Sequence, residues 1–395
     1  MAFLGLGIGQ FKLDQKANAA SAKAVMAPTF QVDPFWPKPL PNHWVLGNVI
    51  GVAVDGRDNV YIVHRNSDDK FSPMTELGLK TGVSECCTPA PPVLEFDQEG
   101  NLIHAWGGPG EGYTWPSSNH GLEVDSKGNV WIGGNGGSPG GGPRNAKPEP
   151  YDSHILEFTN DGKFIKQIGE PGQKPDSNST THFGKVAEIA IDEKLKDVYV
   201  ADGYGNRRVA VLEYPSGAFK KYWGAYGNKP VDGPVPYKPG EPLPQQFRGP
   251  VHCAQPTNDG LLYVCDRGAD RIQVFKRDGT YVTEKQIAPK TLAQGSVWDI
   301  AFSHDPEQKF MYVVDGQNMK IYVMLRKSLE VLYSFGDGGR QPGLWYAPHS
   351  ITTDSKGNIY TTETYEGKRV QKFNYEGLKP VTKQIQGAAW PKGKI

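Results

Sequence analysis

The stretch from His120 to Gly134, HGLEVDSKGNVWIGG, decides the fold of this chain. Apolar and polar residues alternate on both sides of its centre, which is the period of a half-buried β-strand. The central Asp125-Ser-Lys-Gly-Asn129 supplies the turn and left-handed residues that a tight connection between two strands needs. The stretch therefore predicts a β-hairpin.

The same unit occurs six times along the chain. The other five copies begin at Ile50, Ala187, His252, Trp298 and His349. Successive copies start 46 to 70 residues apart, and the shortest spacings are near the length of one four-stranded propeller blade. One copy alone leaves the faces of its small sheet uncovered, so neighbouring copies must stack, and closing the ring protects the sheet edges. The repeats predict an all-β, six-bladed β-propeller with four-stranded blades around a central channel, a pattern that resembles the NHL-type propeller. A pair of β-sandwiches would not explain six copies of one hairpin.

One propeller accounts for residues 29–395 of the 395-residue chain, and residues 1–28 read as an N-terminal tail or the remnant of an atypical export signal. Part of the segment from Phe30 to Trp44 is expected to add a strand to the last blade and close the ring. With 43 basic and 43 acidic residues, the chain lacks the positive excess that nucleic acid or an anionic membrane would attract. No stretch approaches 18 apolar residues, so no membrane span is expected.

The four cysteines are too few for a disulfide scaffold. Cys86 and Cys87 are adjacent in the sequence. Cys253 and Cys265 fall on consecutive strands of one predicted hairpin, where a bridge and two buried thiols are equally good interpretations. A bridge would favour a secreted or periplasmic location over a cytoplasmic one. The oligomeric state is not set by any feature of the sequence.

Three histidines occupy one repeat position. Five residues before the turn stand His120, His252 and His349 in blades 2, 4 and 6, and a different residue in each other blade. Alternate blades of a six-fold ring are about 120° apart, so these side chains are expected to meet on the axis. Three neutral imidazoles without a cysteine suit Zn²⁺, and other divalent transition metals fit nearly as well. The alternative is a set of polar, water-bound residues lining the channel. No metal-binding role is predicted for the six histidines outside this repeat position, which are His43, His64, His104, His154, His182 and His304.

The ends of the second strands should lie on the same face as the three histidines. Arg65, Tyr204 and Arg267 stand there, and arginine forks suit a carboxylate. A tyrosine beside a divalent cation is a candidate general base. Structural ion pairs are the alternative, in particular Asp202 with Arg207 or Arg208 and Asp266 with Arg271.

From about Val49 to Phe373 the sequence resembles the catalytic core of peptidyl-α-hydroxyglycine α-amidating lyase. Six short motifs carry the resemblance and follow one another in the family's order. They are GVAVD from Gly51 with the later His64-Arg65, SNHGL from Ser118, DGYGNRR from Asp202, PVH from Pro250, CDRGADRIQ from Cys265 and APH from Ala347.

The resemblance implies cleavage of a carbinolamide C–N bond to an amide and glyoxylate or a related α-oxo acid. It implies zinc on the three histidines and a small-molecule or peptide substrate with a carboxylate. By the same resemblance Tyr204 would act as general base, Arg65 would stabilise the tyrosinate and the developing oxyanion, and Arg267 would hold the carboxylate.

The chain departs from the family next to the last histidine. Ala347 replaces a methionine, and Ser350 replaces an acidic residue that helps to hold a structural calcium. The backbone of Val52 and of Leu122 is left as the possible Ca²⁺ site. Two other hypotheses remain: a different metal-dependent hydrolase or lyase, such as a lactonase, and a non-catalytic NHL-type scaffold. Channel histidines in strict alternation speak against the scaffold.

Overall fold

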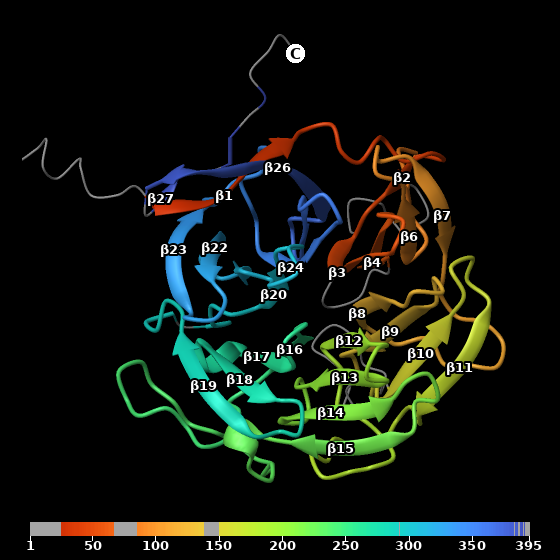
Figure 1. Ribbon diagram of the computed structural model, residues 1–395. Coiled ribbons are helices and arrows are strands. Elements are labelled where there is room, and N and C mark those ends of the chain that lie inside the picture. The colour runs from red at the N-terminus through yellow and green to blue at the C-terminus, as the bar shows by residue number, and fades with distance from the viewer. Residues whose placement is uncertain are drawn as a thin grey trace, which may run out of the picture.

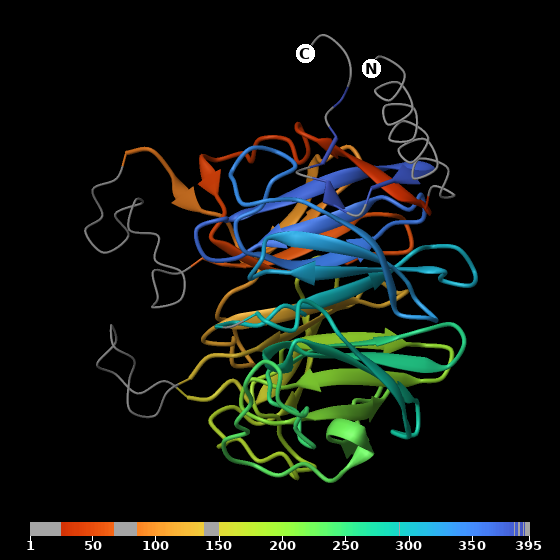
Figure 2. The same ribbon diagram turned by 90° about the vertical axis from the view of Figure 1, so that its left-hand side faces the viewer.

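The computed structural model describes residues 25–66, 85–137, 150–291, 293–382, 384–385, 388–389 and 391. These residues form an all-β, six-bladed propeller, as the repeats predict. Figure 1 shows the sheets arranged around a central axis with the first strand of each blade innermost, and Figure 2 shows the ring edge-on. The helical elements of the described part are two short 3-10 turns, η2 (Ala225–Gly227) and η3 (Arg267–Ala269). No helix in this part is long and apolar enough to cross a membrane.

Each blade is an antiparallel sheet whose strands follow one another from the axis outward. Blades 1 to 3 consist of β3 (Asn48–Val54), β4 (Val60–Arg65), β6 (Val93–Phe96) and β7 (Leu102–Trp106); β8 (Asn119–Val124), β9 (Val130–Gly134), β10 (His154–Phe158) and β11 (Phe164–Gly169); and β12 (Glu188–Asp192), β13 (Asp197–Asp202), β14 (Arg208–Glu213) and β15 (Phe219–Trp223). Blades 4 and 5 consist of β16 (Val251–Pro256), β17 (Leu261–Asp266), β18 (Arg271–Lys276) and β19 (Tyr281–Gln286); and β20 (Asp299–Phe302), β21 (Phe310–Asp315), β22 (Lys320–Leu325) and β23 (Glu330–Phe335), with β27 (Gln384–Ile385) parallel to β23. Blade 6 consists of β24 (Pro348–Thr353), β25 (Ile359–Glu363), β26 (Arg369–Val381) and β1 (Val25–Asp33), and the short β2 (Trp44–Val45) and β5 (Thr88–Pro89) pair separately.

The ring closes where the two ends of the described chain meet. Strand β1 pairs antiparallel with β26 and becomes the outermost strand of blade 6, side by side in red and blue in Figure 1. The expected closing strand is therefore present, although it ends at Asp33 and begins at Val25. Residues 25–28, which were expected to belong to the tail, are part of this strand, because β1 pairs with β26 from Val25 onward.

The predicted hairpin turns are closed by their first aspartate. Oδ1 of Asp125 accepts hydrogen bonds from the backbone N–H of Lys127 (3.0 Å) and Asn129 (2.8 Å). Gly128 takes the left-handed conformation with φ of 84°, which costs glycine little. Asp354 closes the corresponding turn of blade 6 in the same way. These turns hold the inner strands in register.

Apolar cores lie between neighbouring blades, one at each of the six interfaces. Strand β13 shows how the alternation produces them. Tyr199 and Ala201 pack against blade 4, whereas Val198 and Val200 pack against blade 2. Because each blade is covered on both faces, its inner strand is held firmly enough to aim side chains at the axis.

Both cysteine pairs form disulfides. Cys253 and Cys265 face each other across β16 and β17, so the bridge is the correct one of the two interpretations. Cys86 and Cys87 form a disulfide between adjacent residues.

Candidate metal centre

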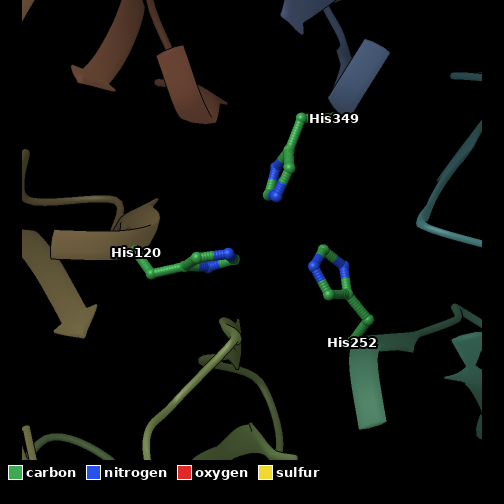
Figure 3. A group of neighbouring side chains, drawn as sticks. All are labelled: His120, His252 and His349. Atoms are coloured by element: carbon green, nitrogen blue, oxygen red, sulfur yellow. The ribbon is translucent and has the colours of Figure 1, made fainter. Parts of the chain in front are cut away.

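The three histidines at the shared repeat position meet on the propeller axis. His120, His252 and His349 lie on the innermost strands β8, β16 and β24, with relative exposures of 1%, 2% and 3%. In each of these strands the register shifts by a β-bulge at the histidine or within two residues of it, and a bulge re-aims side chains. Figure 3 shows the three rings converging from separate blades toward a common centre.

The separation of the rings suits one shared ion. The ring centroids lie 4.8 to 5.3 Å apart, and one nitrogen from each ring lies within 4.8 Å of the others. Three nitrogens at the usual zinc distance would be about 3.4 Å apart in a tetrahedral site. The three rings are therefore close enough that a small inward movement of the side chains would let them hold one ion with an open fourth position.

The histidines are held neutral. Burial lowers the pKa of each of the three imidazoles well below its ordinary value, and the charge of Arg267 lowers each of them further. A neutral imidazole is the form that binds a metal, so no proton has to be displaced near neutral pH.

The outer nitrogens of two of these rings bond to the next blade. Nδ1 of His120 lies 2.7 Å from the carbonyl oxygen of Ala187, and Nδ1 of His252 lies 2.5 Å from that of Trp298. A carbonyl only accepts, so Nδ1 carries the proton and Nε2 presents its lone pair. The Nε2 atoms of these two rings lie within 3.1 Å of the hydroxyl of Tyr204.

Tyr204 and Arg267 lie against the histidines. The hydroxyl of Tyr204 is 3.1 Å from Nε2 of His120 and 3.0 Å from Nε2 of His252. Nη1 of Arg267 donates to the same hydroxyl at 3.2 Å. The predicted base and one predicted arginine are thus brought into contact at the mouth of the histidine site.

Arg65 lies at the end of β4, beside blade 2. Its Nη2 donates to Oδ1 of Asn135 at 2.9 Å, and Oδ1 of Asn135 also accepts from the hydroxyl of Ser118. The charge of Arg65 contributes to lowering the pKa of His120 and of His349. Arg65 therefore belongs to the same site, although the contact with Tyr204 described above is made by Arg267.

Two residues for which the sequence predicts no role hold Arg267. Its guanidinium lies over the indole of Trp298, 4.6 Å from the ring centroid, and its Nη2 donates to Oε1 of Gln294 at 2.8 Å. Trp298 stands at the repeat position of the three histidines, which was a usable signal. Gln294 lies in the loop before blade 5, and no repeat pattern marks it.

Two carboxyl groups meet in the channel next to the histidines. Glu188 and Asp299 are hydrogen-bonded to each other, and burial raises the pKa of Glu188 well above its ordinary value and that of Asp299 to about 6. Both shifts favour the protonated form, so the two buried carboxyls favour a proton held between them. Glu188 also accepts from the backbone N–H of Ala254, and Asp299 from that of Ile351, so each carboxyl ties its blade to a histidine strand.

The two residues predicted to hold a calcium line one cavity. Val52 and Leu122 line a small cavity of about 10 Å³ together with Ser350 and the carboxyl pair Glu188 and Asp299. A cavity of this size has room for one water-sized particle.

The aspartates at two strand ends form structural ion pairs. Asp202 pairs with Arg208 at 2.8 Å and Asp266 with Arg271 at 2.9 Å, and all four side chains are fully buried. His64, one of the histidines read as ordinary, is also buried and bonds to the backbone of Gly47 and of Pro91.

Fold and site together define the class: this is a six-bladed β-propeller with three imidazoles converging near the start of its innermost strands. A family model described as "Lactonase, 7-bladed beta-propeller" matches residues 169–333. NHL repeat-containing protein 3 of Mus musculus is 24% identical over 364 residues, which are 88% of this chain and 84% of that protein. Peptidylglycine alpha-amidating monooxygenase of Rattus norvegicus is 26% identical over 361 residues, covering 86% of this chain and 32% of that protein. The chain thus spans about a third of that relative's length.

Two solved structures are similar to this chain over most of its length. A protein of unknown function from Bacteroides thetaiotaomicron has a TM-score of 0.50 at 16% identity, covering 84% of this chain and 70% of that one. Virginiamycin B lyase from Staphylococcus aureus has a TM-score of 0.45 at 16% identity, covering 83% and 85%.

Proposed function

We propose that this protein is a metal-dependent lyase that cleaves a carbinolamide C–N bond, giving an amide and glyoxylate or a related α-oxo acid. The observation that carries the proposal is the convergence of His120, His252 and His349 with the hydroxyl of Tyr204 at 3.0 to 3.1 Å from two of their nitrogens. The distant similarity to the amidating monooxygenases supports it. The whole-protein activity of those relatives is not carried over, since the matched part is about a third of their length.

Three neutral imidazoles suit Zn²⁺ or another divalent transition metal. A cation bound there would polarise the substrate hydroxyl as a Lewis acid. The protein's own contribution is to keep the three rings neutral and to bring one nitrogen of each ring toward one point.

The remaining steps belong to side chains that surround this point. Tyr204, in its tyrosinate form, accepts the proton of the substrate hydroxyl, the C–O bond becomes a carbonyl as the C–N bond breaks, and the proton ends on the departing amide nitrogen. Arg65 stabilises the tyrosinate and the developing oxyanion. Arg267 holds the substrate carboxylate, for which its buried Nε has no hydrogen-bond partner among the described residues.

The experiment measures metal first and activity second. Purified protein is analysed for zinc and other transition metals, then assayed for glyoxylate release from N-benzoyl-α-hydroxyglycine. We expect about one metal ion per chain and metal-dependent glyoxylate release, both abolished in His120→Ala. Metal-free protein that does not bind zinc on titration would refute the proposal.

A lactonase is the second candidate, favoured by the family model that matches residues 169–333. That model describes seven blades, whereas this ring has six. Lactone hydrolysis without glyoxylate release would select it. A non-catalytic scaffold is supported by the similarity to NHL repeat-containing protein 3, and absence of bound metal would select that hypothesis.

Two further expectations remain proposals. A structural Ca²⁺ would use the backbone of Val52 and Leu122, and the nearby cavity lined by Glu188 and Asp299 supports it. Calcium in the same metal analysis tests it. Secretion or a periplasmic location is supported by the two disulfides, and fractionation of the producing cell tests that.

A further inference from the structure

The histidines of blades 2 and 4 share one way of being oriented. Nδ1 of His120 meets the carbonyl of Ala187, and Nδ1 of His252 meets the carbonyl of Trp298. Ala187 and Trp298 stand at the histidine repeat position of blades 3 and 5. Each imidazole is therefore oriented by the equivalent residue of the next blade around the ring.

The histidine of blade 6 reaches its neighbour differently. Nδ1 of His349 lies 3.1 Å from Oγ of Ser350, and that hydroxyl donates to the carbonyl of Ile50 at 3.0 Å. Ile50 is the residue at the histidine repeat position of blade 1. The pattern of the other two histidines is thus kept, with one hydroxyl inserted between ring and carbonyl.

The carbonyl of Ile50 is available because of a bulge in β3. Val49 pairs with His64 and Gly51 pairs with Val63, so Ile50 is the extra residue between two paired ones. A bulged residue is left out of the ladder, and its carbonyl needs a donor from elsewhere when it is buried. Ser350 supplies that donor.

The direction of this chain of hydrogen bonds follows from the chemistry of its members. A carbonyl only accepts, so the single hydroxyl proton of Ser350 goes to Ile50. Oγ then accepts from Nδ1 of His349, which must carry a proton. Nε2 of His349 is left as an unprotonated lone pair, like those of His120 and His252.

We propose that Ser350 is a positioning residue of the metal centre. Its hydroxyl links Nδ1 of His349 to the carbonyl of Ile50 and so fixes the tautomer and the orientation of that imidazole. The inference rests on the metal site of the proposed function and assigns a role to the residue that departs from the resembled family. Partners that orient a metal-bound histidine typically change metal affinity by 10- to 100-fold when they are lost.

The first experiment compares Ser350→Ala with Thr353→Val by zinc titration of metal-free protein in competition with a chelator. Thr353 is a matched control, because its hydroxyl also bonds to a carbonyl of a neighbouring blade, that of Phe302, from the same strand β24. We expect the dissociation constant for zinc to rise about 10- to 100-fold in Ser350→Ala and to change less than about threefold in Thr353→Val. Equal affinities in the two variants would overturn the inference.

A second pair keeps the test valid if Ser350→Ala folds poorly. Ser350→Thr retains the hydroxyl, and Ser350→Val places a side chain of nearly the same shape as threonine there without a hydroxyl. Only the valine variant should therefore lose zinc affinity. The tautomer of His349, read from the ¹⁵N shifts of metal-free protein, should be Nδ1-protonated in wild type and mixed in the valine variant.

The two proposals fail in different ways. Wild-type protein that does not bind zinc refutes the metal centre itself. Wild-type protein that binds zinc, with no difference between the threonine and valine variants in affinity or tautomer, refutes only the role of Ser350.

Discussion

The hydroxyl oxygen of Tyr204 lies 3.0 Å from Nε2 of His252, one of the three nitrogens that converge on the propeller axis. The preceding Gly203 makes this approach possible. A Cβ on Gly203 would lie 2.1 Å from the backbone of Val251, the residue before His252. A side chain at Gly203 would therefore push the tyrosine away from the histidine.

Tyr204→Phe should separate metal binding from catalysis. The phenyl ring keeps the packing while the hydroxyl that takes the proton is lost. We expect unchanged zinc content and a fall in kcat of about 10²- to 10⁴-fold. Tyr226→Phe is the control, since the Tyr226 hydroxyl bonds to Glu284 at the outer part of the blades. Undiminished turnover in Tyr204→Phe would show that another group is the base.

Arg267→Lys should weaken substrate binding more than it affects the metal. Lysine keeps the charge but loses the fork that contacts Tyr204 and Gln294 and the flat face over Trp298. We expect kcat/KM to fall about 10- to 100-fold, largely through KM, with zinc content unchanged. Gln294→Ala removes only one contact of the guanidinium and should cost less. An unchanged KM in Arg267→Lys would contradict the carboxylate role.

Glu188→Gln should change how stability depends on pH. Burial raises the pKa of Glu188, so between its unfolded and folded pKa values the native protein binds more protons than the unfolded chain. Wild-type stability should therefore fall as the pH rises through that window. Glutamine resembles the protonated carboxyl, still donates to Asp299 and does not titrate. We expect the variant to lose less stability than wild type as the pH rises above the unfolded-state pKa of a glutamate, in denaturant unfolding of metal-free protein. Parallel pH profiles of the two proteins would contradict a shared proton.

The two disulfides should contribute unequally to stability. The Cys253–Cys265 bridge closes a loop with a sequence separation of 12, which corresponds to about 2–3 kcal/mol of restricted unfolded-state entropy. Cys86 and Cys87 are adjacent, so their bond restricts almost nothing beyond the chain itself. Reductant should lower the free energy of unfolding by about 2–3 kcal/mol in Cys86→Ala/Cys87→Ala, which keeps the longer bridge, and hardly at all in Cys253→Ala/Cys265→Ala, which lacks it. If reductant destabilised the Cys253→Ala/Cys265→Ala variant more than the other, restriction of the unfolded chain by the longer bridge would not explain the stability.

The sequence by itself determined the ring and the identity of its three convergent histidines. Both follow from repetition: a hairpin copied six times needs neighbours to cover its faces, and a residue type at one repeat position in alternate copies must return to one point on the axis. The sequence also placed Tyr204 and Arg267 beside that point. Only the tertiary structure decided which further groups complete the site. Gln294 lies in a loop outside the repeat, Ser350 was notable in the sequence only as a departure from a pattern, and the partnership of Glu188 with Asp299 joins blades 3 and 5 across the channel. Such contacts depend on distances between strands far apart in the chain, and the period of a sequence carries no information about those distances.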